Sequence, residues 1–431
     1  MTKHSGQSCR DNSPEIDEGV SYTGYRDALN LVYANVHPVA SEELPLHACA
    51  GRIVAEDLIA AIDNPSNDVS LKDGFAVRSA DIDSASPQHP VRLPVIGSVF
   101  AGGSFRGKVA QRTAVKICSG SPIPVGADAV VSDEFCQETA SEVLVRANAE
   151  PGRNILRAGE EVKAGSTIVK QGRMLLPGYL GLAAAGGLSR ARVYRRPKVA
   201  VIAIGDEVVA PGRKLRPGQL YASNLVTTCA WLAAFGASYD TAVIPDDKDA
   251  IQTALLKHAS SADAVITSGG AWGSERDLVV GVLDELGWNK FFHHVRMGPG
   301  KGVSFGLLRG KPVFCLPGGP ASNEKAFLQF ALAGVVRLGG QMKHPLPTFI
   351  ARLTQNIKSR HRNWTEFKDA YLSQDADGGY LVTPYRNLSR LQSIACASCL
   401  ICIPEGKDSL NAGDMVTVQL LTPTLECEPQ S

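Results

Sequence analysis

The sequence lacks the features that direct a chain to nucleic acid or into a membrane. Its 44 lysines and arginines nearly balance 43 aspartates and glutamates, the formal net charge is +1 at pH 7, and no long basic run offsets this balance. Nucleic acids attract an excess of positive charge, so we expect no general nucleic-acid binding. The most apolar stretch, Leu175–Leu188, contains glycines and is too short to span a bilayer.

A targeting signal is also lacking at the N-terminus. Residues 1–20 are polar and contain no apolar core. We therefore predict no signal peptide, and we expect this segment to be disordered. A cytoplasmic protein that contacts no membrane is the resulting expectation.

Cysteines with metal-ligand spacing are scarce. The ten cysteines mostly stand alone in apolar segments, as reduced core thiols do. One cluster, Cys396-Ala-Ser-Cys399-Leu-Ile-Cys402, has a spacing that suggests an iron–sulfur or zinc site. We interpret Ser393–Ile403 as a strand, in which alternation sends Cys399 to the face opposite the other two cysteines. No fourth ligand lies nearby, so a metal site is not the favoured interpretation.

The chain is long enough for several domains. Its 431 residues exceed what one hydrophobic core supports, which predicts two to four domains. A hydrophobic fraction of 44% and a charged fraction of 20% are typical of globular proteins. The 42 glycines and 25 prolines indicate many turns and short strands.

The N-terminal half is predicted to hold few helices and many short strands. A helix is expected over Ser21–Val36 with Ser21 as its N-cap, a strand over Gly51–Asp63, and a short helix over Pro177–Gly187. Between Val91 and Val145, short apolar segments alternate with glycine and proline without a convincing helix, which predicts a small β-domain. Its expected strands include Leu93–Phe100, Ala114–Cys118 and Ala129–Ser132.

Strands and helices alternate after Arg195-Arg196-Pro197. The predicted strands are Lys198–Ile204, Ser238–Ile244, Ala262–Thr267, Val303–Leu308 and Pro312–Leu316, and the predicted helices are Ser223–Phe235, Ala250–His258, Leu278–Leu286 and Ala321–Val336. This alternation predicts a parallel sheet with helices on both faces. After the linker His344–Pro347, residues 348–421 alternate throughout and predict a small β-barrel or sandwich.

Acids follow three successive strands of the predicted sheet. The first strand ends in Gly205-Asp206-Glu207, the second in Pro245-Asp246-Asp247, and the third in a glycine loop that contains Asp277. The carboxyl ends of parallel strands meet at one edge, where open α/β sheets bind ligands. Carboxylates without histidine or cysteine partners suit a hard cation such as Mg²⁺, which bridges protein and phosphate oxygens.

Glycine-rich turns at the same edge are suited to an anion. The loop Ser268–Asp277, with Gly269 and Gly270, joins a strand to a helix and leaves free N–H groups at the helix start, although an ordinary turn capped by Ser274 explains it equally well alone. Gly298-Pro299-Gly300-Lys301-Gly302 adds a lysine, and Pro317-Gly318-Gly319-Pro320 precedes another helix. Together with the acids, these turns predict a site for a phosphate-bearing anion and Mg²⁺. No G-x-G-x-x-G or P-loop lysine follows the first strand, so an unrelated nucleotide-binding protein is discounted.

With these motifs in place, the sequence resembles the MoeA/gephyrin E-domain family, the molybdopterin molybdenumtransferases, from about Ser21 to Leu421. The stretches that carry the resemblance are Asp73–Val77, Cys118–Val131, Arg157–Val162, Ile204–Glu207, Ser268–Asp277, Pro299–Lys301 and Leu316–Pro320.

The resemblance implies an elongated homodimer of multidomain α/β plus β chains. A central three-layer α/β domain with a parallel sheet would be accompanied by a linking α/β domain, an inserted small β-domain and a C-terminal β-barrel-like domain. The expected boundaries are residues 1–20 for the N-terminus, 21–65 and 149–192 for the linking domain, 66–148 for the inserted β-domain, 193–340 for the α/β domain and 346–424 for the C-terminal domain.

The implied reaction takes molybdate and adenylylated molybdopterin, uses Mg²⁺, releases AMP and inserts molybdenum into the dithiolene. The molybdopterin adenylyltransferase and recipient molybdoenzymes are the implied protein partners. By resemblance, Glu207, Asp247 and Asp277 would position Mg²⁺ and the phosphates, and Asp73 and Ser119 of a second subunit would complete the cleft. The implied anion pocket comprises Gly269, Gly270, Lys301, Pro317 and Pro320, with Ser389 near molybdate.

Several motif positions depart from the family pattern. These are Lys72, Trp272, Gly298 and Gly319, and an arginine expected in the last domain is interpreted as Lys368, which gives up bidentate contact with an oxyanion. Two functions therefore stay open: a competent transferase with a modified pocket, and a non-catalytic paralogue that binds molybdopterin as a carrier or scaffold. Retention of the acids and of Lys301 favours catalysis.

Overall fold

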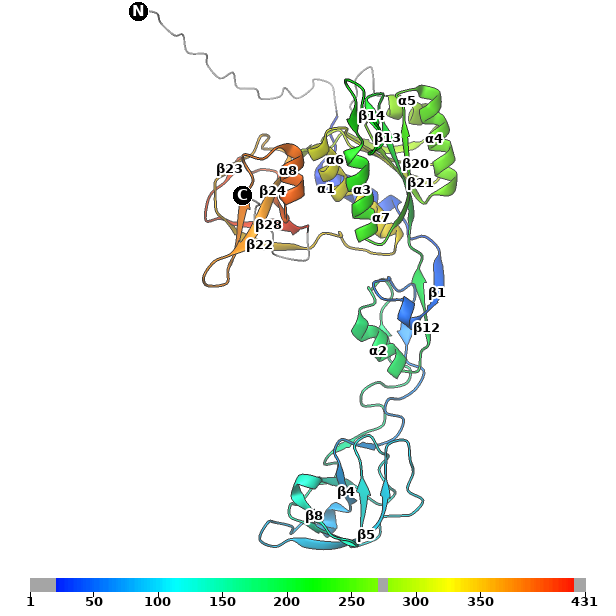
Figure 1. Cartoon of the computed structure of the whole chain (residues 1–431), viewed down its shortest axis with the longest axis vertical. Helices are drawn as coiled ribbons and strands as arrows, with labels where there is room; N and C mark the ends of the chain where they lie inside the picture. The colour runs from blue at the N-terminus through cyan, green and yellow to red at the C-terminus, as the bar shows by residue number, and fades with distance from the viewer. Residues whose placement is uncertain (1–20, 270–277, 422–431) are drawn as a thin grey trace, which may run out of the picture. The chain divides into compact units, whose positions relative to one another are not determined.

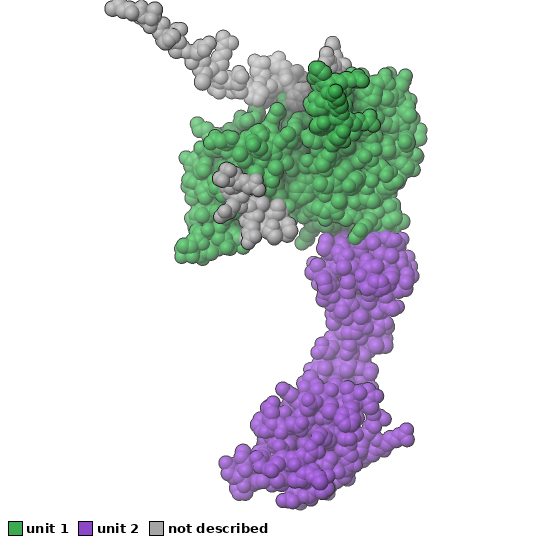
Figure 2. Space-filling model, in the orientation of Figure 1, with its two compact units in different colours: residues 1–40, 194–431 green, residues 41–193 purple. Residues whose placement is uncertain are grey.

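The computed structural model describes residues 21–269 and 278–421. The chain forms two compact units (Figures 1 and 2). Unit 1 consists of residues 1–40 and 194–431, and unit 2 of residues 41–193. Asp277, Gly270, Trp272 and Ser274 lie outside the described residues, so the structure does not test the predictions made for them.

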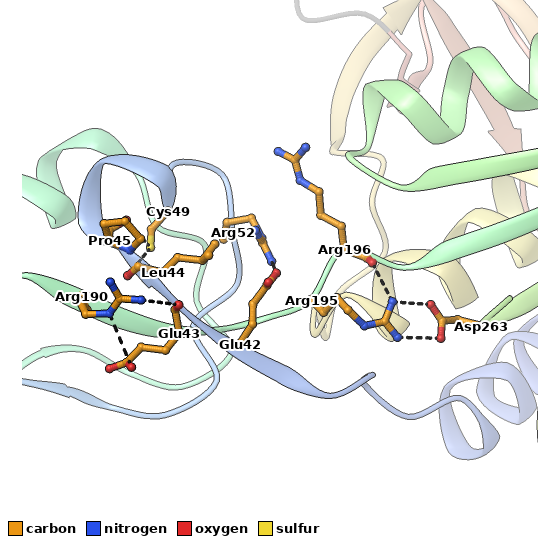
Figure 3. A network of polar contacts seen from close by, with 10 residues as sticks. All are labelled: Glu42, Glu43, Leu44, Pro45, Cys49, Arg52, Arg190, Arg195, Arg196 and Asp263. Carbon is orange, nitrogen blue, oxygen red and sulfur yellow. Dashed lines mark hydrogen bonds and ion pairs between the residues drawn. The ribbon is translucent and has the colours of Figure 1, made fainter. Parts of the chain in front are cut away.

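The linking part of unit 2 is built from short paired strands and one helix. Its elements are β1 (Ser41–Pro45), η1 (Leu46–Ala48), β2 (Leu58–Ile59), β3 (Val69–Ser70), β10 (Ile155–Leu156), β11 (Thr167–Val169), α2 (Pro177–Ala185) and β12 (Arg190–Tyr194). The strands pair as β1–β12, β2–β11 and β3–β10. Pro177 occupies the first turn of α2, where its missing N–H costs no hydrogen bond. Within this region Arg52 pairs with Glu42 and Arg190 with Glu43 (Figure 3).

The strand predicted over Gly51–Asp63 is mostly irregular. Only β2 and isolated bridges at Ile53 and Val54 have strand pairing there. The buried side chains Val54 and Leu58 of this segment pack into a core with Leu175 and Val193, without a continuous ladder.

The inserted β-domain, for which many short strands were predicted, is a six-stranded sheet. Its strands are β4 (Gly74–Val77), β5 (Val91–Val99), β6 (Ala114–Ile117), β7 (Ala129–Ser132), β8 (Cys136–Glu138) and β9 (Glu142–Val145), with the turns η2 (Ser79–Asp81) and η3 (Asp133–Phe135). The order is β7-β4-β6-β5-β9-β8, and only β5 and β6 run parallel. Phe75, Leu93 and Val131 form part of its buried core.

The α/β domain of unit 1 has the three-layer arrangement that the sequence predicted. Its sheet has the order β16-β13-β17-β21-β20-β18. The strands are β13 (Lys198–Ile204), β16 (Ser238–Ile244), β17 (Ala264–Ser268), β18 (Asn289–His293), β20 (Ser304–Leu308) and β21 (Lys311–Leu316), and β14 (Val208–Val209) pairs with β15 (Leu220–Tyr221) beside it. Alternate residues of β13 enter two separate cores: Val199 and Val201 face one, Ala200 and Ile202 the other.

Helices cover both faces of this sheet (Figure 1). One face packs against α1 (Tyr25–Asn35), α3 (Ser223–Ala234), α6 (Pro320–Ala326), the π-helical η4 (Phe327–Ala331) and α7 (Leu332–Leu338). The other packs against α4 (Lys248–Ser261) and α5 (Leu278–Glu285). The helix α1 thus shares a core with the α/β domain, whereas the predicted linking domain began at residue 21. Ser21 is not its N-cap, because the helix begins at Tyr25 and Gly24 occupies the cap position.

The sheet is mixed rather than wholly parallel. Strands β16, β13, β17 and β21 are parallel, but β20 runs antiparallel to both β21 and β18. The reason is the connection between β20 and β21, in which Arg309 and Gly310 have positive φ angles of 51° and 76°. Two consecutive positive φ angles form a tight hairpin turn, which can only join antiparallel strands. Strand β18 was not predicted.

The C-terminal domain is a closed five-stranded barrel. Its strands are β22 (Thr348–Leu353), β24 (Thr365–Gln374), β25 (Tyr380–Pro384), β26 (Cys399–Ile403) and β28 (Met415–Leu420), and a pairing of β24 with β26 closes the ring. The short β23 (Ile357–Lys358) pairs with β27 (Ser409–Leu410). From the α/β domain, β19 (Met297–Gly298) adds in parallel to β24.

The strand predicted over Ser393–Ile403 begins later than expected. Residues Arg390–Cys396 form α8, and only Cys399–Ile403 is the strand β26. The helix starts with a capping box, in which Ser389 and Gln392 exchange hydrogen bonds. Among the described residues, no group of three or more histidine, cysteine or acidic side chains is placed to hold a metal ion. No helix among them is long and apolar enough to cross a membrane.

Candidate functional site

The acidic edge of the α/β sheet lies where β13 and β16 end. These strands are neighbours, so Glu207 and Asp247 follow adjacent strands, and both are exposed. Asp247 caps α4, because its Oδ1 accepts a hydrogen bond from the Ala250 N–H at 2.9 Å. The carboxylate of Glu207 folds back over Gly205, where a Cβ atom would lie 2.7 Å from its Oε2. Carboxylate oxygens suit Mg²⁺, but these two alone form no metal site within the described residues.

A polar clamp holds the turn Pro317–Gly319 next to that edge. The Asn323 amide donates to the Pro317 carbonyl at 2.8 Å and to Ser268 Oγ at 3.0 Å. The Asn224 amide donates to the Gly318 carbonyl at 2.8 Å and to the same Ser268 hydroxyl at 3.3 Å. The turn is therefore fixed to the end of β17 by two asparagines that sequence reasoning missed.

Gly269 has to be glycine for two reasons. Its φ angle is 98°, a left-handed conformation that side chains disfavour. A Cβ atom there would lie 2.4 Å from the Ile204 carbonyl oxygen at the end of β13. Gly269 thus lets β17 leave the sheet against β13, which is a structural explanation for part of the predicted anion loop.

A cavity of about 900 Å³ lies between the α/β domain and the barrel, within unit 1. Its walls come from the turn Gly298–Gly302, the turn Pro317–Gly319, the segment around β23 and β24, the end of β25, and α8. Lys301 and Pro317, two residues of the predicted anion pocket, line it. Pro320, Gly269, Glu207 and Asp247 are not among its lining residues.

Basic side chains dominate the lining. Six lysines and arginines face two acids, Glu366 and Asp369; the basic residues are Lys301, Lys358, Arg360, Lys368, Arg386 and Arg390. An excess of cations around a partly enclosed space concentrates anions. Sequence reasoning missed Lys358, Arg360, Arg386 and Arg390, although the basic run Lys358–Arg362 was a signal that could have found two of them.

Glu366 organises one side of the cavity. Its Oε1 accepts hydrogen bonds from Ser359 Oγ at 2.9 Å and from the Arg360 and His361 N–H groups at 2.6 Å and 3.0 Å. Its Oε2 pairs with Lys368 Nζ at 3.0 Å. Burial alone would raise the pKa of Glu366, but Lys368 and these hydrogen bonds hold its pKa below the usual value. Glu366 is therefore a fixed anion that orients the basic loop.

A buried ion-pair network lies behind the cavity wall. Lys325 on α6 is fully buried, and it pairs with Glu324 at 2.8 Å and with Asp369 on β24. Burial raises the pKa of Glu324, and the nearby Asp369 raises it further, while Lys325 opposes both effects. The network ties α6 of the α/β domain to β24 of the barrel.

Aromatic rings form another part of the lining. Tyr22 and Trp364 have ring centroids 5.4 Å apart, and His361 lies 4.6 Å from Trp364. All three residues line the cavity. Rings of this kind offer apolar contact to a planar ligand next to the cations.

Ser389, predicted to lie near molybdate, begins α8. Its hydroxyl accepts a hydrogen bond from the Gln392 N–H at 3.3 Å and so serves the helix cap. Arg390 and Ser393 of the same helix line the cavity, whereas Ser389 does not.

Asp73 and Ser119 lie together in unit 2. The Asp73 Oδ1 accepts a hydrogen bond from the Ser119 N–H at 2.7 Å, and both residues are exposed, as is Lys72. The adjacent Gly74 cannot carry a side chain, because a Cβ atom there would lie 1.9 Å from the Val131 carbonyl oxygen. The motif Asp73-Gly74 thus presents one carboxylate on a rigid strand end.

Three family models cover most of the chain. The MoeA N-terminal region (domain I and II) matches residues 23–187, the probable molybdopterin binding domain matches residues 200–335, and the MoeA C-terminal region (domain IV) matches residues 351–421. The order of these regions agrees with the order of the domains described above.

Curated relatives and a solved structure extend the same similarity. The molybdopterin molybdenumtransferase of Haemophilus influenzae is 33% identical over 390 residues, which cover 89% of this chain and 94% of the relative. Molybdopterin molybdenumtransferase 2 of Mycobacterium tuberculosis is 35% identical over 88% of this chain and 95% of its own length. The crystal structure of the molybdopterin biosynthesis MoeA protein from Pyrococcus horikosii superimposes with a TM-score of 0.81 at 33% identity, covering 94% of this chain and 100% of that one. The fold, the motifs and these similarities show that the chain belongs to the MoeA family of molybdopterin molybdenumtransferases, the transferases of molybdenum cofactor biosynthesis.

Proposed function

We propose that this protein transfers molybdenum from molybdate to adenylylated molybdopterin in the cytoplasm, with Mg²⁺ and with release of AMP. The observation that carries the proposal is the cavity of about 900 Å³ with its excess of basic side chains. Molybdate and the phosphates of the second substrate are oxyanions, and such groups bind where several lysines and arginines converge. The names of the curated relatives support the same activity.

The residues divide into an oxyanion pocket and a cation edge. Lys301 and Pro317 belong to the pocket with Lys358, Arg360 and Arg390. Pro320 starts α6 directly after the Pro317–Gly319 turn, and Ser389 starts α8 beside Arg390, so both set the position of the pocket wall. Gly269 and Gly270 are part of the proposed anion pocket, and Gly298 and Gly319 line the cavity.

Glu207 and Asp247, together with Asp277, are our proposed holders of Mg²⁺. When bound there, the ion would neutralise charge that develops on phosphate oxygens as the adenylate is cleaved. Their all-oxygen donor set suits Mg²⁺. The side chains themselves orient the phosphates at the sheet edge, next to the turn clamped by Asn224 and Asn323.

A homodimer is part of the proposal, with Asp73 and Ser119 completing the cleft of a second subunit. A candidate subunit contact is the exposed face of α2, which presents Gly178, Gly181, Leu182 and Ala184 to solvent. Small and apolar residues exposed together are typical of surfaces that bind another protein. The adenylyltransferase that supplies the substrate and the molybdoenzymes that receive the product are the further partners we propose.

The alternative is a paralogue that binds molybdopterin as a carrier or scaffold without catalysis. Lys368 pairs with Glu366 at 3.0 Å, so one cation of the cavity is already partly neutralised within the protein. This observation favours a protein that binds molybdopterin but binds molybdate only weakly. The transferase function requires the acidic edge of the sheet, whereas binding without catalysis does not.

Complementation of a strain that lacks its molybdenumtransferase separates the two functions. We expect the parent protein to restore molybdoenzyme activity and Glu207→Ala and Asp277→Ala to abolish the rescue. Asp377→Ala, in an exposed turn of the barrel, is the matched control and should rescue fully. A soluble parent that fails to rescue would exclude the transferase function, and equal rescue by all variants would exclude the proposed metal site.

A further inference from the structure

The two acids that line the cavity differ in how many of their carboxylate oxygens are available to a ligand. Both oxygens of Glu366 are engaged, with Ser359, Arg360, His361 and Lys368. Its pKa lies below the usual value, for the reasons given above. A carboxylate held in this way is a poor proton acceptor, because protonation would break its hydrogen bonds.

Asp369 is engaged on one side only. Its Oδ1 pairs with the buried Lys325, which anchors the side chain from behind. Its Oδ2 has no hydrogen-bond partner in the part of the chain that the structure describes, and the residue lines the cavity. The geometry is that of a positioned carboxylate with one oxygen available to a ligand.

The charged and titratable groups around Asp369 come from five elements. They are Lys325 and Glu324 on α6, Glu366 and Lys368 on β24, Tyr385 after β25, Arg390 on α8 and Cys399 on β26. Lys325 pairs with Asp369 directly, whereas the cations Lys368 and Arg390 share the cavity lining with it. The cations offset the repulsion that a lone carboxylate would exert on an incoming oxyanion.

We propose that Asp369 is a catalytic residue that moves a proton from substrate thiol to molybdate oxygen. This inference rests on the proposed function. Insertion converts molybdate and an enedithiol into a trioxomolybdenum dithiolene and one water. Two Mo–S bonds form, one Mo–O bond and two S–H bonds break, and both protons leave with the molybdate oxygen as water.

Molybdenum remains hexavalent in this step, so no oxidant or reductant is needed. Asp369 accepts the proton of one thiol on Oδ2 and returns it to the oxygen that departs, which regenerates the carboxylate. Lys325 holds Oδ1 throughout and so keeps Oδ2 directed at the cavity. Positioned acid–base groups of this kind accelerate a step by about 100-fold or more.

The test compares Asp369→Asn with the parent chain in molybdenum transfer to adenylylated molybdopterin. We expect kcat to fall about 100-fold with KM for molybdate within twofold, because the amide keeps the shape but accepts no proton. The acidic limb of kcat against pH should disappear in Asp369→Asn and return, displaced, in Asp369→Glu. Asp408→Asn, an exposed acid of the barrel outside the cavity, is the control and should leave kcat unchanged.

The possible outcomes are distinguishable. An active parent with an unchanged kcat in Asp369→Asn would overturn the role of Asp369 alone. Equal losses in kcat and in molybdate binding, with no change in the pH profile, would show a structural role and would also overturn it. A folded parent without transfer activity would overturn the proposed function together with this inference. If Asp369→Asn does not fold, the displaced acidic limb of Asp369→Glu decides the question, and an identical limb counts against the proposal.

Discussion

The sheet edge and the cavity of unit 1 hold opposite charges. Asp206, Glu207 and Asp247 lie at the carboxyl ends of β13 and β16, whereas the cavity beside the barrel is lined mainly by lysines and arginines. The Pro317–Gly319 turn belongs to both regions, because it lines the cavity and is clamped to Ser268 at the end of β17. The acidic sheet edge and the basic cavity thus adjoin the same clamped turn.

The two regions also differ in the contacts that hold their charged side chains in place. Glu207 and Asp247 are exposed side chains on loops, and their support is a helix cap or a backbone contact. The cavity depends on buried charges, namely Glu366 in its lining and Lys325 behind Asp369. Buried charges require partners, since an unpaired one costs several kcal/mol. The cavity should therefore be the more sensitive region to single substitutions.

The largest expected effect comes from Lys325→Met. The substitution removes the cation shared by two carboxylates, and we expect the free energy of unfolding of unit 1 to fall by about 3–5 kcal/mol. Lys407→Met, at an exposed lysine of the barrel, should change it by less than about 0.5 kcal/mol. Urea unfolding followed by circular dichroism measures both values. Equal effects of the two variants would contradict the importance of the buried network.

The next effect concerns Gly269. In Gly269→Ala, the new Cβ meets the Ile204 carbonyl oxygen and the φ angle of 98° is strained, so we expect a loss of about 2–3 kcal/mol. Gly212→Ala is a matched control, because its φ angle is 88° but no atom lies within 4 Å of the new Cβ. The control should lose about 1 kcal/mol from conformation alone. A difference near zero between the two melting curves would exclude the clash as the reason for glycine.

The sheet could be predicted because its signals are local and periodic. Acids follow the apolar runs Lys198–Ile204 and Ser238–Ile244, and the rule that ligands bind at carboxyl strand ends singled out Glu207 and Asp247. That their strands are neighbours is seen only in the structure. The strand β20 was predicted, over Val303–Leu308, but its antiparallel direction was not, because apolar periodicity carries no direction. The positive φ angles at Arg309 and Gly310, which fix the hairpin, belong to a residue pair that is not a usual turn signal.

The cavity could be predicted only in part. Lys301 and Pro317 lie in glycine-rich turns for which the sequence predicted anion binding. Arg386 and Arg390 reach the cavity through the closure of the barrel, and no local sequence pattern predicts that closure. The strand predicted over Ser393–Ile403 overlaps the end of α8, although the Ser389–Gln392 capping box was present in the sequence. Asp369 could not be singled out from the sequence, because its partner Lys325 on α6 is brought to it only by the fold.

A smaller effect should show which of the two regions binds molybdate. Arg390→Ala and Lys358→Ala each remove one cavity cation, and we expect the dissociation constant for molybdate to rise about fivefold, which corresponds to about 1 kcal/mol. Glu207→Gln should leave this constant unchanged within twofold, because that side chain does not line the cavity. Isothermal titration calorimetry measures all three, with Lys407→Ala as the control. A stronger effect of Glu207→Gln than of Arg390→Ala would place the oxyanion at the sheet edge instead.

The smallest effect lies at the opposite end of the sheet, where an acid is fully paired. Asp263 precedes β17 and accepts two hydrogen bonds from Arg195 at 2.8 Å, as Figure 3 shows, and one from the Lys198 N–H at 2.8 Å. Burial opposes ionisation there, but Arg195 and the Lys198 N–H outweigh it and hold the pKa of Asp263 below its usual value. A lowered folded pKa contributes stability above the unfolded pKa of about 3.9, and this contribution is lost as pH falls below that value.

Asp263→Asn should therefore lower the melting temperature by about 2 °C at pH 7, with a difference that shrinks below about pH 4 as the parent loses its charge. Asp240→Asn removes an exposed pair with Lys198 on the neighbouring strand and should have a smaller effect at every pH, because solvent screens it. Calorimetric melting between pH 3 and pH 8 compares the two variants with the parent. A difference for Asp263→Asn that stays constant with pH would mean that shape rather than charge stabilises this end of the sheet, whereas a difference that shrinks at low pH would show that the charge of Asp263 does.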